Sequence, residues 1–387
     1  MDVWAPSWRP GALRAILVAA RTGPAGMSDL AVPLNLHEFE TAAAARLPRM
    51  VFDYFAGGAN DEVAVRTSRE AWGAIALRYR VLRDVSQRSL ATTILGNELA
   101  FPLLVAPMAF QRLAHPDGEI AVARAADALG AGMVLSTLAT TSIEDVRAAT
   151  RGPLWFQLYI YRDRELSRAL VERAERAGCS ALVLTVDAPL LGRRERDERN
   201  GFHVPSDTPV PNLTGDPRAT LAQGAAGGSA LALFVERYWD SSISWRDLEW
   251  LRSITSVPLL VKGIVRGDDA RLALEHGAAG VIVSNHGGRQ LDTSVPTARV
   301  LPEVADAMGG RGALLVDGGI RRGTDMLKAL ALGAQAVLLG RPVLWGLAAG
   351  GTDGVRRVLH LLRDEFDLAL GLAGCRAPAE LTRDFVA

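Results

Sequence analysis

The 387-residue chain lacks the features that would place it in several broad classes of protein. Its only cysteines, Cys179 and Cys375, are too few for a disulfide framework, which favours a reduced, cytoplasmic setting. Its 43 basic and 43 acidic side chains cancel, so no net field attracts nucleic acid or an anionic membrane. No uninterrupted apolar run approaches the roughly 18 residues of a membrane-spanning helix. We therefore expect a protein that binds neither nucleic acid nor membranes.

The two ends of the chain also lack recognisable address signals. In the first 27 residues, "MDVWAPSWRPGALRAILVAARTGPAGM", a short apolar patch is interrupted by Arg14, and no convincing cleavage site follows it. The last residues, "RDFVA", match none of the receptor-read tripeptides. We predict that residues 1–30 are a flexible extension and that residues 31–387 form a single domain.

What the chain does contain is one repeated pattern. Short runs of leucine and β-branched residues alternate with Ala-, Arg- and Glu-rich stretches of helical period. The eight apolar runs are 103–106, 133–136, 155–158, 182–185, 259–262, 281–284, 314–317 and 337–340. Continuous apolar strands separated by helices are typical of a parallel sheet that helices cover.

Eight such units in one domain predict an α/β fold, the (β/α)8 TIM barrel. An open, doubly wound sheet is the alternative, and it requires a Gly-x-Gly-x-x-Gly turn after the first strand. The corresponding stretch, "VAPMAFQRLAHPDG", has no such turn. Two additions to the barrel are expected. One is an N-terminal helical extension that includes "LPRMVFDYFAGGAND", and the other is a long loop after strand 4, roughly residues 196–240, as either an active-site lid or disorder.

Polar residues stand where the predicted strands end. The residues at these ends are Ser136, Gln157, Tyr159, Thr185, Lys262, Ser284, His286, Asp317 and Arg341. A single polar residue at a barrel rim is more often structural than functional, because its hydrogen bonds are easily satisfied there. The carboxyl ends of all eight strands meet at one face, however, and active sites of such barrels lie at that face. The convergence therefore predicts an active site.

The stretch "SNHGGRQLD", residues 284–292, indicates what kind of ligand this site accepts. His286 is a base that titrates near neutral pH, and Gly287 and Gly288 allow the backbone to bend sharply. Arg289 can then turn its guanidinium toward a carboxylate beside the atom that loses a proton. Arg193 or Arg194 can complete a two-arginine clamp. The alternative is that Arg289 pairs with a distant carboxylate and is structural.

Two further features suggest a bound anion. Lys262 ends a strand as "LLVKG", where a buried ammonium needs an anion, either an acidic side chain or a charge that develops on a cofactor. The stretches "LVDGGIRRG" and "LLGRP" end strands 7 and 8, the usual place of a phosphate in these barrels. Their glycines expose backbone N–H groups, and Arg321 or Arg341 adds positive charge. No metal site is predicted.

Taken together, these motifs resemble the FMN-dependent α-hydroxy acid oxidases and dehydrogenases. The resemblance is carried by "FQLY", "LTVDAPLLGRRE", "LLVKG", "SNHGGRQLD", "DGGIRRGTD" and "LGRPVLWGLA", in the order of the family, and it extends from about Leu36 to Cys375. It implies FMN as the cofactor. It also implies that His286 is the active-site base, that Asp317 is the carboxylate paired with it, and that Lys262 stabilises negative charge on the flavin.

The resemblance assigns the remaining site residues by position. Those that match substrate-binding positions are Tyr54, Tyr159, Arg194, His286 and Arg289. Those that match cofactor-binding positions are Pro107, Met108, Ala109, Ser136, Gln157, Thr185, Lys262, Ser284, Asp317, Gly318, Gly319, Arg321, Gly340 and Arg341. It also implies a homotetramer.

One departure bears on the substrate. Leu138 stands where glycolate-oxidising members carry a large aromatic side chain, so we expect a wider apolar space and a larger, mandelate-like or branched (S)-2-hydroxy acid. The expected reaction is oxidation to the 2-oxo acid with O2 as acceptor, giving H2O2. The alternatives are a dehydrogenase that uses a quinone or another acceptor, a phosphate-binding barrel enzyme without flavin, and a barrel that serves only as a binding scaffold.

Overall fold

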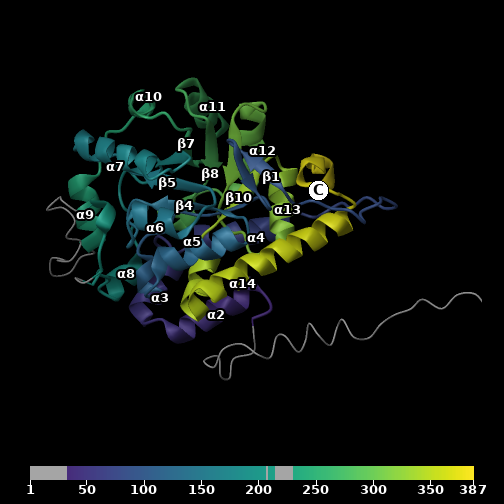
Figure 1. Cartoon of the computed structure of the whole chain (residues 1–387), viewed down its shortest axis with the longest axis horizontal. Helices are drawn as coiled ribbons and strands as arrows, with labels where there is room; N and C mark the ends of the chain where they lie inside the picture. Colours follow the sequence, from purple (N-terminus) through teal and green to yellow (C-terminus); the bar gives the residue numbers. More distant parts are fainter. Residues whose placement is uncertain (1–32, 206–207, 214–229) are drawn as a thin grey trace, which may run out of the picture. The chain divides into compact units, whose positions relative to one another are not determined.

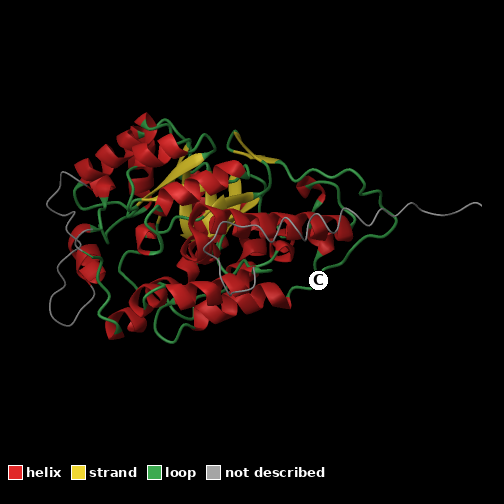
Figure 2. Ribbon diagram, turned by 60° about the horizontal axis from the view of Figure 1, so that its bottom comes forward, coloured by secondary structure: helices red, strands yellow, loops and turns green. Residues whose placement is uncertain are grey.

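The computed structural model describes residues 33–205, 208–213 and 230–387. Residues 35–387 form one compact unit. The extension predicted for residues 1–30 lies outside the described residues. Within the compact unit, eight parallel strands close into a barrel, and helices surround it (Figures 1 and 2). The predicted TIM barrel is confirmed.

The barrel strands coincide with the eight apolar runs of the sequence. In chain order they are β3 (Leu103–Val105), β4 (Gly132–Ser136), β5 (Leu154–Leu158), β6 (Ala181–Thr185), β7 (Leu259–Ile264), β8 (Gly280–Val283), β9 (Ala313–Val316) and β10 (Ala336–Leu339). Each strand pairs with its neighbour in the sequence, and β10 closes the ring against β3. The carboxyl ends of all eight strands therefore share one face.

A helix follows each barrel strand and covers its outer side. These helices are α5 (Gly118–Ala128), α6 (Ile143–Ala149), α7 (Arg164–Arg176), α10 (Trp245–Ile254), α11 (Gly267–Glu275), α12 (Thr297–Met308), α13 (Gly323–Ala331) and α14 (Arg341–Ala373). Alternate strand residues point outward to these helices and inward to the barrel axis. The inward set, which includes Trp155, Ile282 and Leu338, forms a core of its own.

A hairpin that the sequence analysis did not predict precedes the barrel. Its strands are β1 (Thr92–Ile94) and β2 (Asn97–Leu99), joined by Leu95 and Gly96, both with positive φ. Ile94 and Leu99 belong to the same core as the inward barrel residues. The hairpin therefore supplies apolar side chains to the barrel interior.

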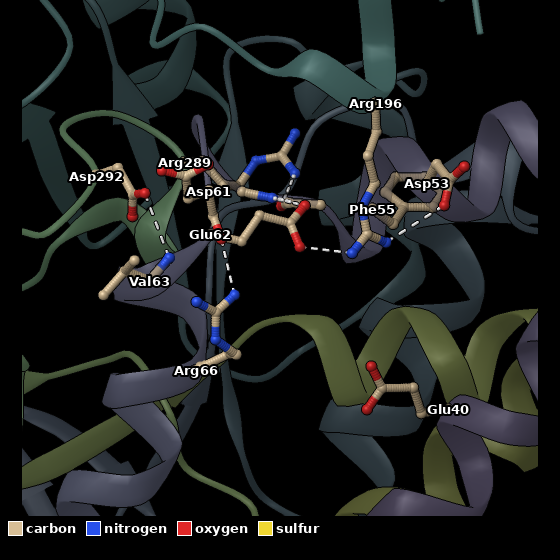
Figure 3. Close-up of polar contacts among 12 residues, drawn as sticks. Glu40, Asp53, Phe55, Asp61, Glu62, Val63, Arg66, Arg196, Arg289 and Asp292 are labelled. Atoms are coloured by element: carbon tan, nitrogen blue, oxygen red, sulfur yellow. Dashed lines mark hydrogen bonds and ion pairs between the residues drawn. The ribbon is translucent and has the colours of Figure 1, made fainter. Parts of the chain in front are cut away.

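The predicted N-terminal helical extension consists of α2 (Leu36–Arg46), α3 (Arg49–Ala56) and α4 (Val63–Ala74). The carboxylate of Asp292 accepts hydrogen bonds from the first two backbone N–H groups of α4, those of Val63 and Ala64 (Figure 3). This contact ties α4 to the loop after β8. On the other side, Arg196 bridges Asp53 of α3 and Glu62 (Figure 3).

The long segment after β6 contains α8 (Glu195–Arg199) and α9 (Ala230–Tyr238), and residues 206–207 and 214–229 lie outside the described part. The end of this segment is hydrogen-bonded to the residues just after β5. The backbone N–H of Arg162 donates to Tyr238 O, and that of Asp240 donates to Ile160 O, both at 3.0 Å. Both cysteines are free and buried. Among the described residues, no helix combines the length and apolarity needed to cross a membrane.

Gly288 shows how closely α4 approaches the loop after β8. It has φ +74°, and a Cβ built on it would lie 2.7 Å from the backbone nitrogen of Val65. Gly310 has nearly the same conformation, φ +76°, with nothing within 4 Å of such a Cβ. Alanine substitutions at these two glycines therefore distinguish two costs. Both variants carry the cost of a left-handed backbone, and only the Gly288 variant also carries the cost of a steric clash.

We predict that Gly310→Ala lowers the free energy of unfolding by about 1 kcal/mol, the cost of a left-handed alanine. Gly288→Ala should cost about 2 kcal/mol more, because α4 must also move away. Urea unfolding of both variants beside the wild type measures the difference. Equal decreases in the free energy of unfolding of the two variants would show that α4 is not tightly packed against Gly288.

Candidate active site

A cavity opens where the barrel strands end, and the space in it and in the solvent at its mouth amounts to about 1170 Å³. Every residue that the sequence analysis assigned to the site lines this cavity, with the exception of Ser284. Ser284 is fully buried beneath it and accepts hydrogen bonds from Lys262 Nζ, at 2.8 Å, and from the backbone N–H of His286, at 3.1 Å. Ser284 thus holds the Lys262 ammonium and the backbone of His286 in place, and its assignment to the cofactor stays a prediction.

His286 and Asp187 form a half-buried pair on this face. The distance from His286 Nδ1 to Asp187 Oδ1 is 2.7 Å. Burial lowers the pKa of His286, as do the nearby Lys262 and Arg194, although the Asp187 carboxylate acts in the opposite direction. Burial alone would raise the pKa of Asp187, but the imidazole and Lys262 outweigh it, so that the pKa is lowered. The stable combination is an ionised Asp187 and a neutral His286 that donates Nδ1–H, which leaves Nε2 free to accept a proton.

This pairing corrects the sequence-based assignment of Asp317. The carboxylate of Asp317 lies 3.1 Å from Lys262 Nζ, and the carboxylate beside His286 is Asp187. The physical reason is that Lys262 is a buried ammonium with an exposed fraction of 4%, so it requires an anion, and Asp317 at the end of β9 supplies it. The pKa of Lys262 is raised, since Asp317 and Asp187 outweigh the effect of burial.

The backbone at His286 explains the glycine pair of the sequence. His286, Gly287 and Gly288 have φ values of +56°, +65° and +74°, three successive residues in the left-handed region. A side chain with a β-carbon adopts this conformation at a cost, which glycine avoids. The strained histidine points to a functional demand on its position, because such strain concentrates at active sites.

Two arginines, Arg194 and Arg289, lie next to each other in the lining of the cavity. Arg289 donates through Nη1 to the carbonyl oxygens of Tyr54, at 2.5 Å, and Gly57, at 3.0 Å, and its guanidinium carbon lies 4.9 Å from the centre of the Tyr54 ring. Arg194 makes only long contacts, 3.5 Å each, to Arg289 O and Gln290 Oε1. Burial and the neighbouring Arg289 lower the pKa of Arg194 to about 10. Such a pair is stabilised by a carboxylate ligand.

A second cluster of positive charge lies at the start of α14. Arg341 donates through Nε to Phe55 O and through Nη2 to Gly57 O, at 3.0 and 2.8 Å. Burial and the other arginines lower its pKa well below the usual value, and they lower the pKa of Arg321 to about 9. Gly340 precedes the helix, whose N-terminal N–H groups favour an anion. Geometry and charge together form a site for a phosphate.

The other wall of the cavity is apolar. Its residues are Leu138, Ala188, Leu191, Leu231 and Trp239. Tyr159 stacks on Trp239, with ring centres 3.7 Å apart and 21° between the planes. Tyr54 stacks in the same way on Phe202, at 4.0 Å and 2°. Burial raises the pKa of both tyrosines, so both hydroxyls remain protonated donors.

Three buried polar atoms of cavity residues fit the FMN that the resemblance implies. Gln157 Nε2, Asp317 Oδ1 and Arg321 Nε have no hydrogen-bond partner among the described residues. The amide oxygen of Gln157 is occupied by Thr137 N and Ser136 Oγ, so its NH2 group is available to a ligand. Since buried polar groups are normally satisfied, these atoms point to a ligand with complementary groups. Together with the phosphate site, they fit a flavin mononucleotide.

The sequence analysis missed Asp187 and the contributions of the long segment after β6. Asp187 was within reach, because it stands two residues beyond the end of β6 in the quoted "LTVDAP". No comparable signal marked Leu231 and Trp239, which line the cavity from a segment without barrel periodicity. Part of the expected lid therefore does face the site.

Comparisons with known proteins agree with this geometry. A family model described as FMN-dependent dehydrogenase matches residues 43–387. The chain is 50% identical over 364 residues to an L-lactate oxidase of Nostoc sp., covering 93% of this chain and 100% of that protein. It is 48% identical over 353 residues to the glycolate oxidase of Spinacia oleracea, covering 91% and 95%.

The same relationship appears among solved structures. A mandelate oxidase with (S)-4-hydroxymandelic acid superposes with a TM-score of 0.88 at 45% identity, covering 92% of this chain and 98% of that chain. The same mandelate oxidase fold with benzoyl-formic acid gives 0.83 at 43% identity, with the same coverage. The chain therefore belongs to the FMN-dependent dehydrogenase family, among its 2-hydroxy acid oxidases, and its cofactor is FMN.

Proposed function

We propose that the protein oxidises an (S)-2-hydroxy acid larger than glycolate to the 2-oxo acid and passes the electrons to O2, giving H2O2. The observation that carries this proposal is the juxtaposition, in one cavity, of a neutral, half-buried histidine with two arginines, the buried Arg194 and the half-buried Arg289. The histidine can take a proton from the substrate while the arginines hold its carboxylate. The two arginines thereby fix the reacting carbon next to the base.

The residues fall into three groups around the reacting atoms. Arg194 and Arg289 bind the substrate carboxylate, and the hydroxyls of Tyr54 and Tyr159 orient its oxygens. His286 accepts the substrate proton at Nε2, and Asp187 stabilises the imidazolium that forms, which Lys262 would otherwise disfavour. Held by its bond to Asp187, the ring does not need to reorient during the reaction.

Bound FMN supplies an acceptor for the two electrons that leave the substrate. Arg321, Arg341 and the N–H groups at Gly340 would hold its phosphate, and Gln157 Nε2 would donate to a polar edge of its ring system. The Lys262 ammonium, held in place by Asp317 and Ser284, would stabilise the electron density added to the ring system. The other cavity residues of the cofactor assignment would form the surface against which the ring system and its side chain pack. Among them are Pro107, Met108, Ala109, Thr185, Gly318 and Gly319.

The size of the substrate is inferred from the apolar wall. Leu138, with an exposed fraction of 3%, leaves more room than an aromatic side chain would, and Ala188 and Leu191 extend the apolar surface. The similarity to mandelate oxidase structures supports a large substituent, and the 50% identity to an L-lactate oxidase makes lactate the second candidate. The oxidases among the relatives support O2 as the acceptor.

A panel of 2-hydroxy acids tests the proposal directly. Mixed without oxygen, (S)-mandelate should bleach the yellow protein with a second-order rate constant at least about tenfold above that for glycolate, because burial of each additional carbon in an apolar pocket is favourable. Admission of air should restore the colour and yield one H2O2 per substrate. The rate constant for (S)-lactate should lie between those for (S)-mandelate and glycolate. Glycolate as the best substrate, or recolouring only with a quinone, would contradict the proposal.

The role of His286 is tested by single-turnover bleaching per bound FMN, which ignores unfolded protein. His286→Ala should retain FMN and slow bleaching by (S)-mandelate by about 10²–10⁴-fold, the usual contribution of a positioned base. His276→Ala is the matched control, since that ring packs on Trp245 and bonds Glu249, away from the cavity. A rate close to wild type in His286→Ala would exclude it as the base.

Two aspartate variants distinguish the pairings found here. Bleaching requires a neutral His286, so its rate falls as the pH drops through the pKa of that imidazole. Asp187 acts to raise this pKa, so Asp187→Asn should move the acidic limb to lower pH and reduce the maximal rate by at least about tenfold. Asp317→Asn should leave the acidic limb in place, because Asp317 pairs with Lys262. The opposite result would restore Asp317 as the partner of His286.

A further inference from the structure

Trp239 is a cavity residue that comes from outside the barrel pattern. It directly follows α9, and it forms an antiparallel bridge with Tyr161, just beyond β5. The guanidinium of Arg162 donates two hydrogen bonds to the backbone of this segment, from Nε to Trp239 O and from Nη2 to Glu236 O, each at 3.1 Å. The position of Trp239 at the cavity is therefore set by backbone contacts and does not depend on side-chain packing alone.

The plane of the indole is also fixed. Tyr159, the tyrosine assigned to the substrate, lies face to face with it at 3.7 Å, and the side chain of Trp239 is almost fully buried, with an exposed fraction of 5%. Its indole N–H has no hydrogen-bond partner among the described residues. A buried N–H group without a hydrogen-bond partner costs free energy. Neither hydrogen bonding nor the mere filling of space therefore explains why position 239 holds a tryptophan.

Phe55 also lines the cavity, but the other residues of the apolar wall are aliphatic. The aliphatic side chains are those of Leu138, Ala188, Leu191 and Leu231. They stabilise any apolar group that is buried against them, so they distinguish poorly between substituents of equal size. An aromatic ring differs, because its negative face and positive edge favour offset or edge-to-face contact with another flat ring. A fixed indole at the wall thus adds a preference for shape and electronic character that the leucines lack.

We propose that Trp239 is a specificity-determining residue that makes the cavity prefer an aryl substituent at C2 over a saturated one of the same carbon skeleton. This inference rests on the proposed function, since it concerns the same substrate. It narrows the substrate class from large 2-hydroxy acids to aryl 2-hydroxy acids. The stack on Tyr159 also means that the residue that selects the ring lies against the residue that orients the reacting oxygens.

The test compares two substrates with the same carbon skeleton, (S)-mandelate, whose ring is aromatic, and (S)-hexahydromandelate, whose ring is a saturated cyclohexyl. The quantity measured is the ratio of their kcat/KM values in wild type, Trp239→Leu and Trp239→Phe. Dividing one ratio by another cancels the intrinsic reactivity of the benzylic position, the FMN content and the folded fraction. Trp239→Leu should lower the ratio about fivefold, within the range of an aromatic pair, and Trp239→Phe should keep most of it.

A binding measurement keeps the inference testable without turnover. Titration of the holoenzyme with the two products, benzoylformate and cyclohexylglyoxylate, gives Kd values from changes in the flavin spectrum. Trp239→Leu should weaken benzoylformate about fivefold relative to its saturated analogue. If that variant does not fold, Trp239→Met replaces it. Trp245→Leu, a change on α10 outside the cavity, is the control and should leave both ratios unchanged.

The outcomes separate the inference from the function on which it rests. An unchanged ratio in Trp239→Leu, or an equal change in Trp245→Leu, overturns the role of Trp239, even when mandelate is a good substrate. A product preference that depends on Trp239 in a protein that oxidises neither acid would uphold the inference and overturn the proposed function. A wild type that binds neither product overturns both.

Discussion

Burial of positive charge is the constraint on which this site depends. Lys262, Arg194 and Arg321 are buried around the cavity at the carboxyl ends of the strands, and Arg341 is half-buried there. Within the part of the chain that the structure describes, Lys262 alone among these four has a carboxylate in direct contact, so the three arginines depend on carbonyl oxygens and on anions that arrive from solution. Empty, the site is electrostatically unfavourable, since each guanidinium raises the cost of the next. A phosphate and a carboxylate relieve that cost, which is why the cavity selects anionic ligands.

The sequence predicted the barrel and most of the site for one physical reason. Buried parallel strands are continuous apolar runs, so the residue at which each run becomes polar marks its carboxyl end. Gln157, Lys262 and His286 were found in this way. The same reasoning does not say which neighbours at the rim turn toward each other, because side-chain direction depends on backbone angles such as the positive φ of His286. The assignment of Asp317 to His286, and the neglect of Asp187, follow from that limit.

Two other features were not predictable for different reasons. The hairpin β1–β2 turns at Leu95 and Gly96, and a leucine in a left-handed turn position gives no turn signal of the kind that asparagine would give. Trp239 lies in a segment that has no strand or helix repeat of the barrel. It reaches the cavity through pairing of its backbone with residues after β5, more than 70 positions earlier in the chain. Long-range pairing of this sort leaves no local pattern in the sequence.

The carbonyl oxygen of Gly57 accepts hydrogen bonds from both Arg289 and Arg341. In the proposed function one guanidinium binds the substrate carboxylate and the other the cofactor phosphate, and a single backbone oxygen just after α3 contacts both. A shift of Arg341 toward an anion would therefore change the position of Arg289, and by reciprocity a shift of Arg289 would change the position of Arg341. Binding of one anionic ligand is thereby coupled to binding of the other through a single carbonyl group.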